Sequence, residues 1–140
     1  MTIGETEKDI AEEFELFTDW TERYEHIIDM GKSIPLIDVK YKDENHIIKG
    51  CQSQVWLHSE MKGDKIFYSA DSDAIITKGL VAMVIRVLSG HKPEEILEAK
   101  MDFIDRIGLK EHLSPTRSNG LMAMIKQMKL DAQAHALAKK

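Results

Sequence analysis

The chain has 140 residues, of which 43% are hydrophobic and 31% charged, and its formal net charge at pH 7 is −5. This length and composition are typical of one compact globular domain, so we expect a single domain over residues 1–140. Nucleic-acid binders gather Lys and Arg on one stripe to neutralise phosphates, whereas the basic residues here are scattered. The composition therefore argues against a nucleic acid as partner.

The first residues and the apolar runs predict a soluble protein of the cytoplasm. Residues 1–15 are acidic and lack the basic-then-apolar order of a signal peptide. The longest apolar stretch, residues 79–88, contains Arg86 and is too short to span a bilayer, so no membrane contact is expected. The only cysteine cannot form an internal disulfide, which fits a reducing compartment.

The N-terminal part predicts two amphipathic helices. The first, over residues 5–17, carries three apolar residues on one face: Ile10, Phe14 and Phe17. Asp19, followed three residues later by Glu22, predicts the start of the second helix. Gly31 suits its C-terminal end. Such helices are not stable alone, so both must pack on another element.

The middle of the chain changes to an alternating pattern that predicts strands. Residues 55–60 and 65–70 alternate between apolar and polar side chains, with a turn at residues 62–64. A shorter strand is expected over residues 46–49. Together these segments predict a three-stranded antiparallel sheet.

A helix over residues 74–88 is apolar nearly all round, which places it at the centre of the domain. Asp71 and Asp73 are expected mainly to cap its first turn. Further helices are expected from Pro93, over residues 102–107 and after Ser114-Pro115. The order of helices, strands and helices favours an α+β fold in which helices pack against the three-stranded sheet.

Cys51 is the first candidate for chemistry. It lies among polar residues at a predicted loop tip after Gly50, whereas a structural thiol usually has apolar neighbours. A single thiol cannot hold a zinc or iron–sulfur site, which needs three or four ligands, but it can attack another sulfur. Only a few per cent of an ordinary thiol is thiolate at neutral pH, and Lys49 and the loop amides could raise that fraction. A buried structural thiol remains the alternative.

Three motifs occur in order along the chain: GCQSQVW at residues 50–56, DSDA at 71–74 with KGL at 78–80, and HLSPTRS at 112–118 with GL at 120–121. In this combination the chain resembles the SufE family of sulfur acceptors. The resemblance runs from about Phe14 to Lys126 and covers most of the chain.

The resemblance implies a fold shared with iron–sulfur scaffold proteins of the IscU kind. It also implies that Cys51 takes sulfur, as a persulfide, from a SufS-like pyridoxal-phosphate-dependent cysteine desulfurase. The sulfur would pass to a SufBCD-like scaffold for iron–sulfur cluster assembly, and its removal would accelerate the desulfurase. The chain would carry sulfur covalently rather than act as a stand-alone enzyme. It would hold no cofactor or metal of its own, and a homodimer is compatible with the family.

Arg117 is carried over from the resemblance as a supporting residue. A guanidinium can steady an anionic sulfur or pair with a partner carboxylate, although an exposed arginine in a first helical turn is the ordinary alternative. Four residues near Cys51 are expected to contact the partner: Gly50, Gln52, Ser53 and Asp73.

Three other interpretations stay open. The chain could be a non-catalytic adaptor that binds a desulfurase, or a sulfur carrier for another pathway. It could also be a scaffold for a metal cluster, which its single cysteine argues against. Four histidines have no ligand-type spacing and are expected at the surface or in turns: His46, His58, His91 and His112. Met122, Met124 and Met128 are expected to fill the core.

Overall fold

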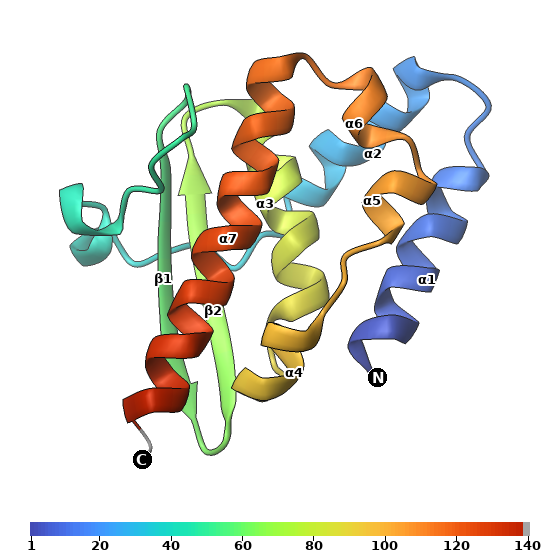
Figure 1. Ribbon diagram of the computed structural model, residues 1–140. Helices are drawn as coiled ribbons and strands as arrows, with labels where there is room; N and C mark the ends of the chain where they lie inside the picture. Colours follow the sequence, from blue (N-terminus) through green and yellow to red (C-terminus); the bar gives the residue numbers. More distant parts are fainter. Residues whose placement is uncertain (139–140) are drawn as a thin grey trace.

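The computed structural model describes residues 1–138 and has the predicted α+β architecture (Figure 1). Its α-helices are α1 (Ile3–Glu15), α2 (Trp20–Gly31), α3 (Ile75–Leu88), α4 (Pro93–Glu98), α5 (Phe103–Arg106), α6 (Leu109–His112) and α7 (Pro115–Ala138). The strands are β1 (Val55–Lys62) and β2 (Lys65–Ser72), and two short 3₁₀ turns, η1 (Val39–Tyr41) and η2 (Glu44–His46), precede them.

The sheet of the described chain has two antiparallel strands, so the prediction of a third strand over residues 46–49 is wrong. Ile47 makes only an isolated bridge with Trp56, and Ile48 N–H donates to the Val55 carbonyl at 2.8 Å. The chain then bends at Gly50, whose φ is +95°, a conformation that favours glycine. The pairing with β1 therefore stops at η2, which includes His46, on one side of Ile47 and at the Gly50 bend on the other.

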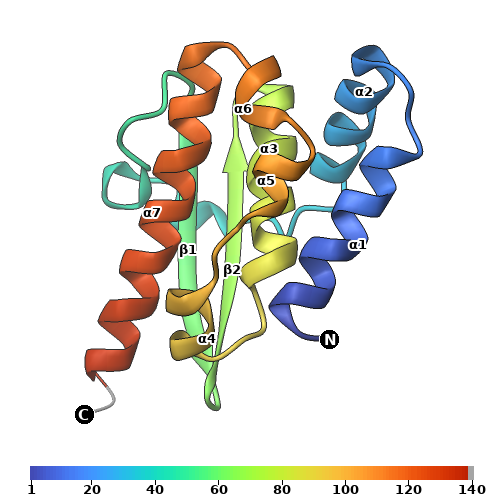
Figure 2. The ribbon, with the colours of Figure 1, turned by 45° about the vertical axis from the view of Figure 1, so that its right-hand side comes forward.

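The two faces of the sheet differ as the alternation predicts. The side chains on one face are buried: Val55, Leu57, Ile66, Tyr68 and Ala70. Helix α7 crosses this side of the strands, where the Tyr68 hydroxyl donates to the Met128 carbonyl at 2.6 Å (Figures 1 and 2). On the other face, Tyr41 of η1 stacks on His58 of β1 with ring centroids 3.8 Å apart.

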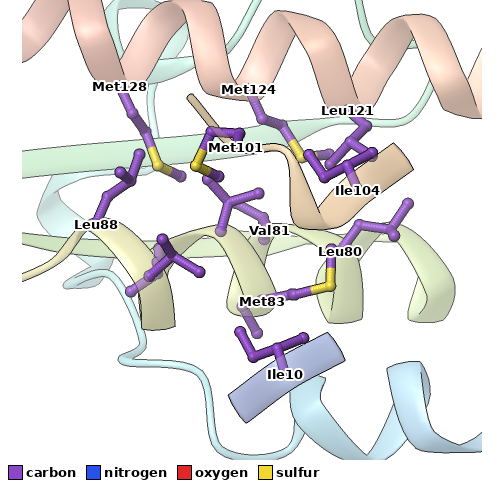
Figure 3. Packing of buried hydrophobic residues seen from close by; sticks show 14 of the residues in the cluster. Ile10, Leu80, Val81, Met83, Leu88, Met101, Ile104, Leu121, Met124 and Met128 are labelled. Atoms are coloured by element: carbon purple, nitrogen blue, oxygen red, sulfur yellow. The ribbon is translucent and has the colours of Figure 1, made fainter. Parts of the chain in front are cut away.

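Helix α3 occupies the centre of the molecule, which confirms the prediction from its apolar circumference. In the close view, α3 lies between α7 and α1, with Met124 and Met128 on one side and Ile10 on the other (Figure 3). These three side chains are at most 1% exposed. The two methionines therefore fill the core, as expected.

Helices α2 and α3 pack at short range through two glycines. A Cβ atom on Gly79 would lie 2.0 Å from the Ile27 carbonyl oxygen, and one on Gly31 would lie 3.1 Å from the Gly79 nitrogen. The backbones can approach this closely only because neither position carries a side chain. The contact sets the position of the first turns of α3.

Four segments meet at one end of the molecule. The loop before β1, the end of β2, the start of α3 and the start of α7 all lie at the top in Figures 1 and 2. All three sequence motifs contribute to this end. Within residues 1–138, none of the helices has both the length and the hydropathy that a bilayer span requires.

Candidate functional site

The base of the loop that carries Cys51 is fixed by residues at the end of β2. Asp73 Oδ1 accepts a hydrogen bond from Gln54 N–H at 3.1 Å, and the Ser72 hydroxyl donates to the Gln54 carbonyl at 2.8 Å. Asp73 itself is exposed. It therefore braces the loop and also faces outward, where a partner can reach it.

The expected capping of α3 by Asp71 and Asp73 is wrong. The N-cap residue is Ala74, and no side chain caps the helix. Asp71 instead pairs with Lys42 at 2.8 Å and with Lys78 at 3.2 Å. Partial burial opposes ionisation of Asp71, but hydrogen bonds from the two lysines hold its pKa below the usual value. The first turn of α3 consequently keeps open N–H groups.

The Cys51 thiol is half-buried against α7. Its S–H donates to the Gly120 carbonyl, with Sγ 3.6 Å from the oxygen. A Cβ on Gly120 would lie 3.5 Å from Sγ, so the absence of a side chain there leaves room beside the thiol. Burial raises the pKa of the Cys51 thiol, which favours its protonated form in the resting protein.

We expect alkylation of Cys51 to be slower in the folded chain than in the urea-unfolded chain near pH 8. The thiolate is the reacting form, and folding favours the protonated thiol because its pKa is raised. The thiol thus stabilises the fold below its unfolded pKa, and this contribution is lost as the pH rises through its folded pKa. Iodoacetamide rates measured against pH check this. Equal rates for folded and unfolded protein at pH 8 would contradict it.

A cleft of about 530 Å³ opens beside Cys51. Its lining comes from the Cys51 loop, the start of α3 and the start of α7: Cys51, Gln52, Ser53, Ala74, Ile75, Ile76, Thr77, Leu80, Ser114, Thr116, Arg117, Gly120 and Met124. No carboxylate is among these residues. Leu80 and Met124 belong to the central core (Figure 3). The cleft therefore has an apolar floor, whereas its other lining residues include the polar Gln52, Ser114 and Arg117.

Arg117 lines the same cleft as Cys51. The Ser114 hydroxyl oxygen accepts a hydrogen bond from Arg117 N–H at 3.2 Å and so caps the first turn of α7. The Arg117 side chain is exposed and makes no ion pair with a carboxylate of residues 1–138. Its guanidinium is available to an anion.

The first turn of α7 is supported from below by contacts that the sequence does not predict. The Trp20 and His112 rings stack with centroids 4.0 Å apart, and the Tyr24 hydroxyl donates to the His112 carbonyl at 2.7 Å. These contacts fix α6 and, two residues later, Ser114. No local pattern predicts them, because the partners lie far apart along the chain.

The remaining site residues lie on the same loop. Gly50 rests against α7, where a Cβ would approach the Ala123 Cβ to 3.2 Å. Gln52 is exposed and Ser53 half-buried, so the loop presents polar groups beside the thiol. Among the residues that the structure describes, no three His, Cys, Asp or Glu side chains are grouped to hold a metal ion.

Fold and site together define a class of small α+β proteins that present one cysteine on a loop beside a cleft. A solved structure of this fold, a hypothetical protein from Thermus thermophilus, matches with a TM-score of 0.77 and 21% identity. The match covers 92% of this chain and 94% of that one.

The sequence comparisons are more specific. The family model SufE, described as an Fe-S metabolism associated domain, matches residues 8–132. An uncharacterized SufE-like protein of Rhizobium etli is 40% identical over 92% of this chain and 90% of its own length. A SufE-like protein of Synechocystis is 38% identical over 91% and 80%. The chloroplastic/mitochondrial SufE-like protein 1 of Arabidopsis thaliana is 36% identical over 89% of this chain, but only 34% of its own length. The chain belongs to the SufE family.

Proposed function

We propose that this protein accepts sulfur from a pyridoxal-phosphate-dependent cysteine desulfurase as a persulfide on Cys51. It then passes the sulfur to a SufBCD-like scaffold in the cytoplasm for iron–sulfur cluster assembly. The observation that carries the proposal is the position of Cys51, on a glycine-bent loop that opens on the same cleft as Arg117. The association of the SufE family with Fe-S metabolism supports this role.

The transfer is a thiol–disulfide-type exchange without net oxidation or reduction. Cys51 loses its proton, and the thiolate attacks the outer sulfur of the persulfide on the desulfurase cysteine. A new S–S bond forms on Cys51, the bond in the donor persulfide breaks, and the desulfurase cysteine leaves as a thiolate that takes up a proton. The same exchange, with Cys51 as the leaving group, delivers the sulfur to the next acceptor.

Docking of the desulfurase has to release the resting thiol. In the free protein, the Cys51 thiol donates to the Gly120 carbonyl, and burial favours its protonated form. Because the thiolate is the nucleophile, this arrangement protects Cys51 from reaction with electrophiles other than its partner. Gly50, Gln52 and Ser53 carry the loop, and Asp73 holds its base from an exposed position. A partner that contacts these residues can move the loop and expose the thiol.

We expect Arg117→Ala to slow sulfur transfer to Cys51 roughly tenfold, because a hydrogen bond to a charged group contributes about 1.5–3 kcal/mol. The side chain is exposed and unpaired with the described carboxylates, so the free energy of unfolding should change little. Lys126→Ala is the matched control, because Lys126 is an exposed cation of α7 outside the cleft. Equal rates of sulfur transfer for Arg117→Ala and Lys126→Ala would contradict a role of Arg117 in the transfer.

The test of the proposed function is desulfurase turnover, measured as alanine formed from cysteine in the presence of a reductant. The protein should accelerate turnover by a desulfurase from the same source, because removal of the persulfide frees the enzyme's cysteine. Addition of a SufBCD-like scaffold should then yield cluster on the scaffold. Unchanged turnover would contradict the proposal, and stimulated turnover without cluster formation would favour delivery to another sulfur-requiring pathway.

A further inference from the structure

Helix α2 supports two of the segments that line the Cys51 cleft. In its C-terminal half, Ile27 packs against Gly79 of α3, where a Cβ would lie only 2.0 Å from the Ile27 carbonyl oxygen. The start of α3, residues 74–77, is part of the cleft lining. The N-terminal half of α2 contacts α6 instead, and α6 leads into the start of α7, which lines the cleft as well (Figure 1).

The contact between α2 and α6 holds His112 by both its main chain and its ring. The Tyr24 hydroxyl donates to the His112 carbonyl at 2.7 Å. The imidazole of His112 stacks on Trp20, with the ring planes 15° apart, and its Nδ1 lies 3.1 Å from the Gly108 carbonyl oxygen. Trp20 and Tyr24 are themselves half-buried, so α2 offers His112 a fixed support.

The chain has little freedom between His112 and Arg117. Leu113 is only 5% exposed and anchors the corner between α6 and α7 in the core. Pro115 is the first residue of α7, and its ring fixes φ at that point. The Ser114 hydroxyl oxygen accepts a hydrogen bond from Arg117 N–H at 3.2 Å. The position of His112 therefore determines how the first turn of α7 begins, and with it the place of Arg117 at the cleft.

Arg117 has no ion pair of its own to fix its guanidinium. The side chain is exposed, and no carboxylate of residues 1–138 pairs with it. Its place beside Cys51 thus depends on its main chain. We propose that Tyr24 and Trp20 are positioning residues, which keep Arg117 at the Cys51 cleft by holding the corner between α6 and α7. This inference rests on the proposed function, because it assigns Arg117 the task of meeting the negative charge of the reacting sulfur atoms.

The experiment measures the charge beside Cys51 in the free protein with two alkylating reagents of similar size. Iodoacetate is anionic and iodoacetamide neutral, and both react with the thiolate of the only cysteine. A change in the pKa of the thiol or in access to it affects both rates alike, so the ratio of the iodoacetate rate to the iodoacetamide rate reports the local charge. At low ionic strength, Arg117→Ala should lower this ratio about threefold, the order expected for one charge several ångströms away in water.

Tyr24→Phe removes only the hydroxyl that donates to His112. It should lower the ratio roughly twofold, because Arg117 then spends less time at the cleft. In the Arg117→Ala background the same change should leave the ratio unaltered, because the positioned cation is absent. Structural loosening alone would speed up both reagents and leave the ratio as in wild type. Tyr41→Phe is the control and should keep the wild-type ratio, because Tyr41 is a half-buried residue of η1 outside the cleft.

Trp20 gives a second reading with its own rescue. Trp20→Leu loses the stack on His112 and should lower the ratio as Tyr24→Phe does. Trp20→Phe keeps an aromatic ring for the imidazole and should retain the wild-type ratio. Equal ratios for these two Trp20 variants would contradict the role of the stack.

A wild-type ratio in Tyr24→Phe or in Arg117→Ala would overturn the positioning role. A further fall of the ratio when Tyr24→Phe is added to Arg117→Ala would overturn it as well, because the hydroxyl would then act by another route. Neither alkylating reagent requires a desulfurase, so the turnover assay with the wild-type protein still decides the proposed function, and the two failures can be told apart.

Discussion

Replacing Cys51 with serine is expected to abolish stimulation of the desulfurase and sulfur transfer together. The hydroxyl of serine is not ionised at neutral pH and cannot form a persulfide, so the acceptor is lost completely rather than slowed. Alanine formation by the desulfurase in the presence of Cys51→Ser should fall to the rate of the enzyme alone. Stimulation that survives the change would favour the non-catalytic adaptor.

The same variant should retain its fold, which separates a carrier thiol from a structural one. Serine can donate to the Gly120 carbonyl as the thiol does, and the site is half-buried at a loop. We expect the free energy of unfolding to change by less than about 1 kcal/mol, as for most substitutions outside the core. Urea denaturation followed by circular dichroism measures this change. Loss of folding in Cys51→Ser would show that the thiol is structural.

Gly79→Ala is expected to destabilise the fold more than an alanine at any other glycine of the chain, because its Cβ would make the shortest contact. The new Cβ would lie 2.0 Å from the Ile27 carbonyl oxygen and 2.7 Å from the carbon of that carbonyl. These are backbone atoms, so α2 and α3 would have to move apart. We expect a loss of about 3 kcal/mol or more, out of a total of roughly 5–15 kcal/mol for a domain of this kind.

The matched control is Gly4→Ala, in the first turn of α1. A Cβ there meets nothing within 4 Å, and alanine is the better helix former by about 1 kcal/mol. Gly4→Ala should therefore leave the midpoint of urea denaturation unchanged or raise it. Equal midpoints for Gly79→Ala and wild type would contradict the close packing of α2 on α3.

The fold was predictable where one segment carries its own signal. The apolar circumference of residues 74–88 predicts the central helix, and the alternation after Val55 predicts both strands and their buried face. The predicted third strand does not form, because His46 belongs to the turn η2 and the chain bends at Gly50, which leaves only Ile47 and Ile48 to pair with β1. The alternating pattern of the sequence contains neither turn.

The candidate site was predictable from its chemistry but not from its contacts. Cys51 and Arg117 belong to recognisable motifs, and the structure places both on one cleft. Asp71 was expected mainly to cap α3, but its partners include Lys42, which lies far away in sequence.

The central claim is that Cys51 carries sulfur, and intact-mass spectrometry tests it most directly. The protein is mixed with a cysteine desulfurase from the same source and free cysteine, then weighed before and after addition of a reductant. The account predicts a mass gain of whole sulfur atoms that the reductant reverses and that Cys51→Ser does not show. An unchanged mass, in a mixture where the desulfurase is turning over, would contradict it.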